Sequence, residues 1–237
     1  ALAAVLRADK CQIYTDVDGV FTADPNKVPS ARKIDAITYD EMLELATLGA
    51  KVLHNRSVEM AKRYHVNLEV LSSFTGHPGT IVKEVVKKME KSHVSGVAKD
   101  KDVARLALVA LENRPGVAFK VFSLLANAKI NVDIILQSIG RHNTKDISFT
   151  VGKQDMERTK KLLEDHVELL GFDHIDVSDR IAKISIVGAG MVHNPGVAAK
   201  MFEALYNAGI NINMISTSEI KVSVLVDLAD ADRAVQV

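Results

Sequence analysis

Apolar and polar residues follow two different patterns along the chain, and the pattern changes near residue 90. Before that point, short apolar runs at 11–15 and 67–71 alternate with amphipathic stretches at 39–48 and 57–64. Short runs bounded by turn residues predict strands, and apolar spacings of three and four predict helices. Their alternation favours an α/β unit with a largely parallel sheet. The charged stretch 83–91 is predicted to be a helical connector.

After residue 90 the pattern is an internal repeat. The run that begins at Pro115 matches the run that begins at Pro195 at about half of its positions, without a gap and 80 residues apart. Such a match indicates two copies of one domain. In both copies Pro opens a predicted helix, where its missing N–H has no partner to lose.

Each copy follows the order strand, helix, strand, strand, and the first adds a helix and a strand. This order predicts an antiparallel sheet with helices on one face, the ferredoxin-like βαββαβ arrangement. The second copy stops after 230–235, short of a final strand. We predict strands at 105–111, 130–137, 146–151 and 174–177 and helices at 117–125 and 155–170 in the first copy, and strands at 183–187, 210–215 and 221–226 and a helix at 197–205 in the second.

Charge and cysteine content narrow the function classes. Thirty basic and 30 acidic residues cancel, without long blocks of one sign, so we expect neither a nucleic-acid nor a membrane partner. Cys11 is the only cysteine, which excludes an intrachain disulfide and favours a reducing, cytoplasmic setting. The eight histidines show no metal-ligand spacing, so no metal site is expected. The first residues have the pattern of a helix already in progress, as though cut from a longer chain.

The strongest short motif is Asp16-Val-Asp-Gly-Val-Phe-Thr-Ala-Asp-Pro, directly after the predicted strand 11–15. Such residues are ordinary in loops, but a loop at the carboxyl end of a strand in an α/β sheet is also where ligands bind. The hydroxyls of Thr15 and Thr22 and the backbone N–H groups suit a nucleotide. An EF-hand is excluded by spacing. A phosphatase of the haloacid dehalogenase type shares Asp-x-Asp-Gly, but the repeat occupies the region where its other acidic residues belong.

The run from Tyr14 to Pro25, together with Glu41-Met-Leu-Glu-Leu-Ala and Gly49-Ala-Lys, resembles aspartokinases. Ser72-Ser-Phe and Ile215-Ser-Thr-Ser-Glu-Ile extend the resemblance over essentially the whole chain. The resemblance implies an amino-acid-kinase domain that binds ATP. The sequence departs from the family pattern at Asn26, which replaces an arginine that many members carry and cannot supply its charge. The nucleotide-binding residues implied by the resemblance are Thr15, Asp16, Phe21, Thr22, Ala23, Asp24, Pro25, Asn26 and Lys51.

The resemblance also implies a division into domains. Residues 1–90 correspond to the end of the kinase domain, 91–179 to a first ACT domain, and 180–237 to a second, incomplete at its C-terminus. The family's Lys-Phe-Gly-Gly motif and its aspartate-binding residues are absent from these 237 residues. Because phosphoryl transfer needs positive charge on the transferred group, no catalytic residue is assigned, and the chain alone is predicted to be inactive.

ACT domains bind a free amino acid at a domain interface, through the loop after the first strand and a facing strand. Backbone N–H groups at a helix start suit its carboxylate. The copies differ, because Asp133 corresponds to Asn213 and Gln137 to Thr217, so only one keeps the carboxylate. The implied effector residues are Asn113, Arg114, Pro115, Gly116, Val117, Ala118, Asn131, Val132, Asp133 and Gln137 in the first copy, and Val192, His193, Val197, Ala198, Asn211, Ile212, Ser218 and Glu219 in the second.

The resemblance thus predicts an aspartate kinase that uses ATP with Mg²⁺ to convert L-aspartate to 4-phospho-L-aspartate. Lysine, threonine or both would inhibit it by feedback at the ACT domains. Because ACT sheets commonly pair edge to edge, we expect a homodimer or a complex with a full-length kinase chain. The alternative is a non-catalytic, amino-acid-binding regulatory subunit.

Overall fold

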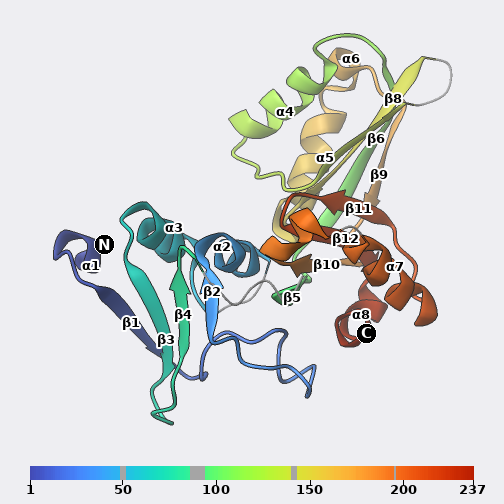
Figure 1. Ribbon diagram of the computed structural model, residues 1–237. Coiled ribbons are helices and arrows are strands. Elements are labelled where there is room, and N and C mark those ends of the chain that lie inside the picture. The colour runs from blue at the N-terminus through green and yellow to red at the C-terminus, as the bar shows by residue number, and fades with distance from the viewer. Residues whose placement is uncertain (49–51, 86–93, 140–142, 195) are drawn as a thin grey trace. The chain divides into compact units, whose positions relative to one another are not determined.

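The computed structural model describes residues 1–48, 52–85, 94–139, 143–194 and 196–237 (Figure 1). The chain forms two compact units, each interrupted in sequence. Unit 1 comprises Ala1–Asp100, Lys183–Val226 and Asp230–Val237, and unit 2 comprises Lys101–Ala182 and Asp227–Ala229. Among the described residues, no helix is both long enough and apolar enough to cross a membrane.

The amino-terminal part of unit 1 is a four-stranded sheet in the order β1-β3-β4-β2, with two parallel pairs and one antiparallel pair. The predicted strands and helices before residue 72 are all present. Of the predicted connector 83–91, Lys83 ends β4, and 86–91 lie outside the described residues. The elements are α1 (Leu2–Val5), β1 (Lys10–Thr15), β2 (Ala36–Thr38), α2 (Tyr39–Thr47), α3 (Asn55–Arg63), β3 (Asn67–Ser72) and β4 (Thr80–Lys83).

Helix α2 begins at a capping box, in which Thr38 and Glu41 satisfy each other's backbone N–H groups. Its apolar face, with Met42 and Leu45, packs into the core of the amino-terminal sheet beside Val70. The helix start is therefore fixed by both a polar and an apolar anchor.

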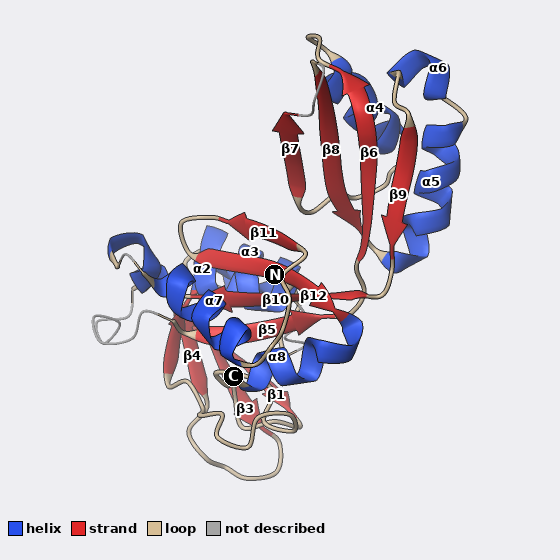
Figure 2. Cartoon of the chain, turned by 90° about the vertical axis from the view of Figure 1, so that its right-hand side faces the viewer, coloured by secondary structure: helices blue, strands red, loops and turns tan. Residues whose placement is uncertain are grey.

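Unit 2 holds the first copy as a sheet in the order β7-β8-β6-β9, with its helices on one face (Figure 2). This order confirms the ferredoxin-like fold. Phe122 and Phe149 meet edge to face in its core, with ring centroids 5.7 Å apart. The elements are β6 (Ala104–Glu112), α4 (Val117–Asn127), β7 (Ile135–Ile139), β8 (Thr144–Val151), η2 (Lys153–Asp155), α5 (Met156–Glu164), α6 (Val167–Leu170) and β9 (His174–Ser178).

The helix predicted at 155–170 is broken into α5 and α6. The His166 ring contacts the Leu162 carbonyl oxygen at 2.8 Å, and the His166 N–H donates to Leu163 instead. The side chain thus occupies the acceptor that a continuous helix would use at this turn. Gly171, at φ +73°, then ends α6.

The second copy lies in unit 1 and has the same sheet order, β11-β12-β10-β5. Its fourth strand is β5 (Gly96–Asp100), which precedes the first copy in sequence and pairs antiparallel with β10. The structure thus corrects the predicted boundaries: the first copy is inserted after Asp100, and the second copy does not lack its final strand. The other elements are β10 (Ile181–Val187), η3 (Ala189–His193), α7 (Val197–Asn207), β11 (Met214–Thr217), β12 (Lys221–Asp227), η4 (Leu228–Asp230) and α8 (Ala231–Gln236).

Strand β10 is buried along its whole length, and from Lys183 onward unit 1 provides a core on each face of the second sheet. Ile184 belongs to the core formed with α7 and α8. Val187, which points to the other face, packs with Ala98 into the core of the amino-terminal sheet, where Leu45 also lies. The second copy and the amino-terminal part therefore share a core within one unit.

Candidate nucleotide and effector sites

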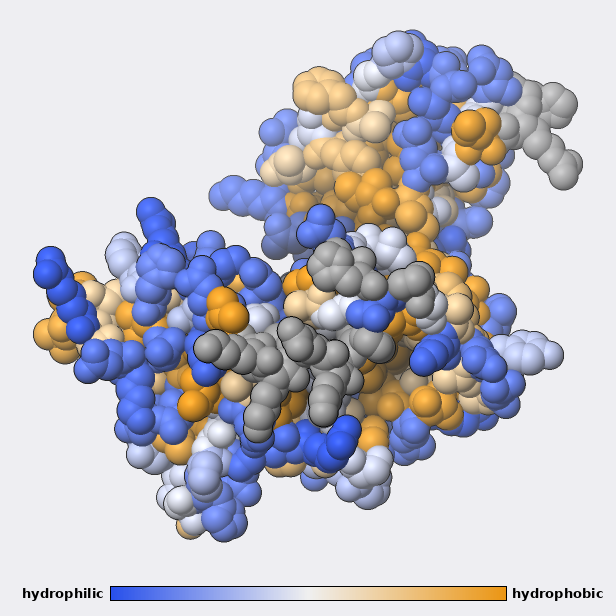
Figure 3. All heavy atoms as spheres, viewed as in Figure 1, coloured by the Kyte–Doolittle hydropathy of each residue, from blue (hydrophilic) through white to orange (hydrophobic). Residues whose placement is uncertain are grey.

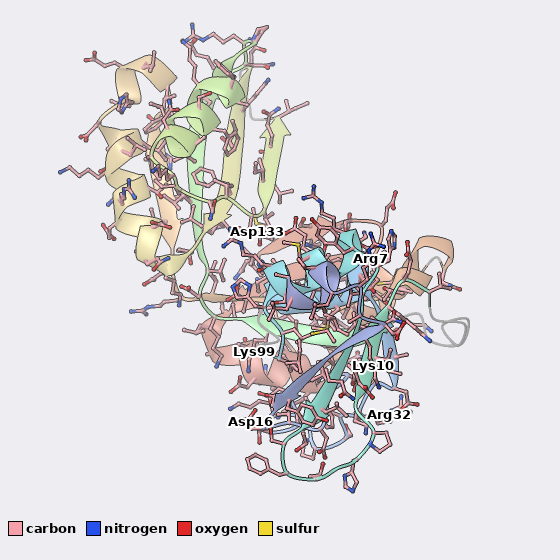
Figure 4. All side chains as sticks on the ribbon, turned by 90° about the vertical axis from the view of Figure 1, so that its left-hand side faces the viewer. Arg7, Lys10, Asp16, Arg32, Lys99 and Asp133 are labelled. Carbon is pink, nitrogen blue, oxygen red and sulfur yellow. The ribbon has the colours of Figure 1, made fainter. Side chains whose placement is uncertain are left out.

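The carboxyl ends of β1 and β3 lie side by side, because the two strands are parallel and pair from Lys10 with Asn67 to Thr15 with Ser72. The Ser73 N–H donates to the Thr15 carbonyl oxygen at 2.8 Å, so the two following loops start together. Asp16 follows the carboxyl end of β1, and Lys10 lies at the other end of this strand (Figure 4). Its exposed carboxylate accepts from the Thr15 hydroxyl at 3.0 Å. This is the edge at which α/β sheets bind ligands.

Asp18 joins the two loops. Its carboxylate accepts from the Thr75 hydroxyl, and the His77 ring lies 3.8 Å from it. The Thr75 hydrogen bond, with smaller contributions from the positive charges of His77 and Lys33, lowers the pKa of Asp18 below its usual value. Sequence reasoning missed Thr75 and His77, because they lie about 60 residues away along the chain and only the parallel strand pairing brings them here.

The run from Phe21 to Asn26 has structural partners of its own. The Thr22 hydroxyl accepts from the Arg32 N–H at 3.0 Å, and the Thr22 carbonyl oxygen accepts from the Val97 N–H of β5 at 2.8 Å. Ala23 packs against the core of the second copy. Asp24 accepts from the Asn26 N–H at 2.9 Å, which fixes the turn. Asp24, Pro25 and Asn26 are exposed, and Lys51 lies outside the described residues.

In the first copy, the loop after β6 is fastened to the hairpin between β7 and β8. The Asn113 N–H donates to the Asn143 carbonyl oxygen at 3.2 Å, and their side chains meet at 3.0 Å. Arg114 pairs with Glu112 at 2.9 Å. Gly116, at φ +89°, starts α4 in a conformation that favours glycine.

The remaining predicted residues of the first copy divide between core and surface. Val117 is buried in the core and Ala118 packs against it, so they offer backbone rather than side-chain groups. Pro115 and Gln137 are exposed, and Gln137 stands opposite Ile147 in the sheet.

Asn131, Val132 and Asp133 lie away from the loop at 113–118. They follow the C-terminal end of α4 (Val117–Asn127), an 11-residue helix that spans about 16 Å. The Asp133 N–H donates to the Thr150 carbonyl oxygen at 3.1 Å, near the start of β6; Figure 4 labels Asp133. One copy by itself therefore does not gather all of its predicted effector residues.

The second copy repeats this arrangement. The Gly188 N–H donates to the Ile220 carbonyl oxygen at 2.9 Å, which ties the loop after β10 to the turn that holds Ser218 and Glu219. Gly196, at φ +97°, starts α7, which opens with Val197 and Ala198. Val192 and His193 lie in η3, and their side chains are outside the described part. Asn211 and Ile212 lie beyond the other end of α7.

One contact at this loop was not foreseen. Glu41 is fully buried, and its Oε1 accepts from the Ala189 N–H at 2.9 Å and from the Ser95 hydroxyl at 2.6 Å. Ala189 opens η3, so a carboxylate of α2 holds the loop of the second copy. In the sequence Glu41 stood out only as the first residue of the run Glu41-Met-Leu-Glu-Leu-Ala, and nothing along the chain indicated a partner 148 residues away.

The comparisons with known proteins match this architecture. The amino acid kinase family matches residues 1–72, and the ACT domain family matches residues 107–167 and 184–237. An aspartokinase of Bacillus sp. (strain MGA3) is 50% identical over 236 residues, which is 100% of this chain and 57% of that protein. The chain thus spans about half the length of the curated relatives it matches.

Solved structures give the same family. The structure of E. coli aspartokinase III with aspartate and ADP, in its R-state, is 30% identical, covers 99% of this chain and 52% of that one, and has a TM-score of 0.85. Its T-state complex with lysine and aspartate is 31% identical, with the same coverage and a TM-score of 0.78.

A structure of aspartokinase alpha and beta subunits is 44% identical, with a TM-score of 0.57. It is matched over 60% of this chain and 93% of its own. That subunit is thus covered almost entirely by this sequence, and the two domain families occur in the order that the motifs predicted. The chain belongs to the aspartokinase family.

Proposed function

We propose that this chain forms the nucleotide side and the regulatory domains of an aspartate kinase. The reaction is the ATP-dependent phosphorylation of L-aspartate to 4-phospho-L-aspartate. Lysine, threonine or both bind at the ACT domains as feedback inhibitors. The motif Lys-Phe-Gly-Gly is not in these 237 residues, so turnover requires further residues of the complete enzyme.

The observation that carries the regulatory part is the duplicated loop. In both copies the loop after the first strand is tied by hydrogen bonds to the following hairpin, and a glycine at positive φ opens the helix. The first N–H groups of α4 and α7, which follow Gly116 and Gly196, have no acceptor inside the helix, as at any helix start. Those donors suit the carboxylate of a free amino acid.

A second ACT sheet completes each effector site in this proposal, because one copy separates its predicted residues. The edge strand β7 favours such pairing, since all five of its residues are exposed and Ile139 is 88% exposed. An apolar edge left open in this way is a surface for pairing with another strand. Apolar side chains also reach the surface elsewhere in unit 2 (Figure 3). The partner is a second copy of this chain or a full-length kinase chain.

ATP with Mg²⁺ is proposed to bind at the carboxyl ends of β1 and β3. Among the described residues, no group of three or more His, Cys, Asp or Glu side chains is placed to hold a metal. That is compatible with Mg²⁺, which usually binds through one or two carboxylates together with substrate phosphates and water. The exposed carboxylate of Asp16 and the hydroxyl of Thr15 are the groups that fit this mode.

The alternative, a regulatory subunit without a kinase domain, fits the first 72 residues less well. Those residues match the amino acid kinase family and form the β1–β3 edge with its loops. A regulatory subunit of aspartate kinase from Thermus thermophilus, 38% identical, matches only 61% of this chain.

Thermal unfolding with added amino acids tests the proposed function. A ligand that binds only the folded state raises the melting temperature, by an amount equivalent to about 2.7 kcal/mol at 100 times its Kd. We expect lysine, threonine or their mixture to raise the melting temperature of this chain, and alanine, as the control, to leave it unchanged. No shift with either amino acid or with both would contradict the regulatory assignment.

A further inference from the structure

The buried carboxylate of Glu41 joins two parts of unit 1 that are far apart in sequence. Its Oε2 accepts from the Thr38 N–H at 3.2 Å and from the Thr38 hydroxyl at 2.8 Å, which closes the cap of α2. Its Oε1 accepts from the Ser95 hydroxyl and from the Ala189 N–H. One oxygen thus accepts from the residue that caps α2, and the other accepts from Ser95 and from the second copy.

This geometry leaves little freedom for helix α2 to move without the loop that begins at Ala189, or for the loop to move without the helix. Glu41 has no exposed surface, and the four donors described here are neutral groups. A buried carboxylate that loses a donor pays the cost of an unpaired polar group. A shift of Ala189 at the start of η3 therefore pulls on the same carboxylate that fixes the first turn of α2.

We propose that Glu41 is the positioning residue through which the effector loop of the second copy acts on helix α2 and the kinase side of unit 1. The inference rests on the proposed effector function of that loop. A ligand held by η3 and the start of α7 changes the position of the Ala189 N–H. Glu41 converts this change into a change at the cap of α2, whose Leu45 lies in the same core as Val20 of the loop after β1.

The substitution Glu41→Gln separates this role from simple packing. An amide has nearly the same shape, but one of its two ends donates instead of accepting. It can satisfy the Thr38 N–H or the Ala189 N–H, but not both at once. The variant keeps the size of the side chain and breaks the link. Glu44→Gln is the matched control, because Glu44 lies on the same helix and its ion pair with Lys221 of β12, at 2.9 Å, joins α2 to the second copy at a residue outside η3.

The test is amide hydrogen exchange of the 237-residue chain with and without lysine, threonine or both. In the wild type, we expect ligand to change exchange at 189–200 and also, by about fivefold or more, in the first turn of α2. In Glu41→Gln the change at 189–200 remains and the change in α2 is lost. In Glu44→Gln both changes remain. A residue with a merely structural role would alter basal exchange, but not this response to ligand.

Two results would overturn the inference. One is a wild type in which 189–200 responds to ligand while α2 does not, and the other is an α2 response of equal size in Glu41→Gln. If no amino acid changes exchange at 189–200, the proposed effector function of the second copy fails, and the coupling fails with it. Circular dichroism establishes that the variant is folded. If it is not, Ser95→Ala removes one donor from Oε1 without touching the cap of α2, and its ligand response in α2 must fall below that of the wild type.

Discussion

The two copies share a loop, a glycine at positive φ and a helix, yet their neighbours differ. In the first copy the loop is fastened inside its own domain, through Asn113 and Asn143. In the second copy the loop is also held by Glu41, outside the repeated domain. Two copies that match at about half of the positions in this run thus differ in their contacts: one loop is held within its own domain, and the other is also bonded to helix α2 of the amino-terminal part. The difference indicates that the neighbours of each copy, rather than the repeat itself, decide which loop is joined to the amino-terminal part.

The largest effect is expected from shortening one buried leucine side chain at the same position of each copy. Leu125 in α4 and Leu205 in α7 are both almost fully buried. Leu→Ala at such sites costs about 3 kcal/mol. We expect Leu125→Ala to destabilise unit 2 alone. Leu205→Ala should also loosen the loop at 21–28, because Ala23 and Val28 pack on the same core.

Hydrogen exchange during urea unfolding would measure both effects. The region 21–28 should lose protection in Leu205→Ala and keep it in Leu125→Ala. If 21–28 stays as protected as in the wild type while α7 opens, the shared core does not link the second copy to the nucleotide loop.

A smaller loss of stability, equal in the two copies, is expected when the glycine that precedes each helix is replaced. Gly116 and Gly196 have φ values of +89° and +97°, and, among the described residues other than the adjoining ones, no atom lies within 4 Å of the place where a Cβ would be added. Substitution by alanine therefore costs only backbone strain, about 1 kcal/mol in each case. Denaturant unfolding of Gly116→Ala and Gly196→Ala would measure this cost. A clearly larger cost in one variant would show that the two helix starts are not the same device.

The smallest expected effect is a pH dependence of stability, and it distinguishes β9, the edge strand of the first sheet, from β5, the corresponding edge strand of the second sheet. His174 in β9 contacts Asp173 at 2.8 Å, and this hydrogen bond raises the pKa of His174 above its usual value of 6.5. The contribution to stability is therefore complete below about pH 6.5 and is lost as the pH rises through the higher, folded-state pKa. Strand β5 closes the second sheet without a histidine.

Proton NMR titration of the wild type and Asp173→Asn would measure the pKa of His174. We expect the substitution to lower it, and Asp179→Asn, a surface carboxylate beyond the other end of β9, is the control. An unchanged pKa in Asp173→Asn would show that the neighbouring carboxylate is not its cause.

The sequence predicted most of the elements and the repeat, because apolar periodicity and the matched runs at Pro115 and Pro195 are local signals. It did not reveal the role of β5, a five-residue strand whose partner comes more than 80 residues later. Pairing of that kind is made by backbone groups, which leave no mark in the side-chain pattern.

The site was predicted to a similar extent. Motifs located Thr15, Asp16 and the glycine loops, since these follow strands or open helices. Asn143, Thr75 and the contact between Glu41 and Ala189 were missed, because each residue meets its neighbour only through tertiary folding. The separation of Asn113 from Asp133 was also not foreseen, although the predicted helix 117–125 lies between them along the chain and so places them at its opposite ends.

The pairing of β5 with β10 has a consequence for the order of events on the ribosome. Strand β5 leaves the exit tunnel before the whole first copy is made, and its partner β10 follows only afterwards. Chains fold domain by domain as they emerge, at about 5–20 residues per second. The inserted domain can therefore be complete while β5 still waits, unpaired, for several seconds. Its shortness and the charged residues Lys99 and Asp100 suit a strand that must stay soluble until its partner arrives.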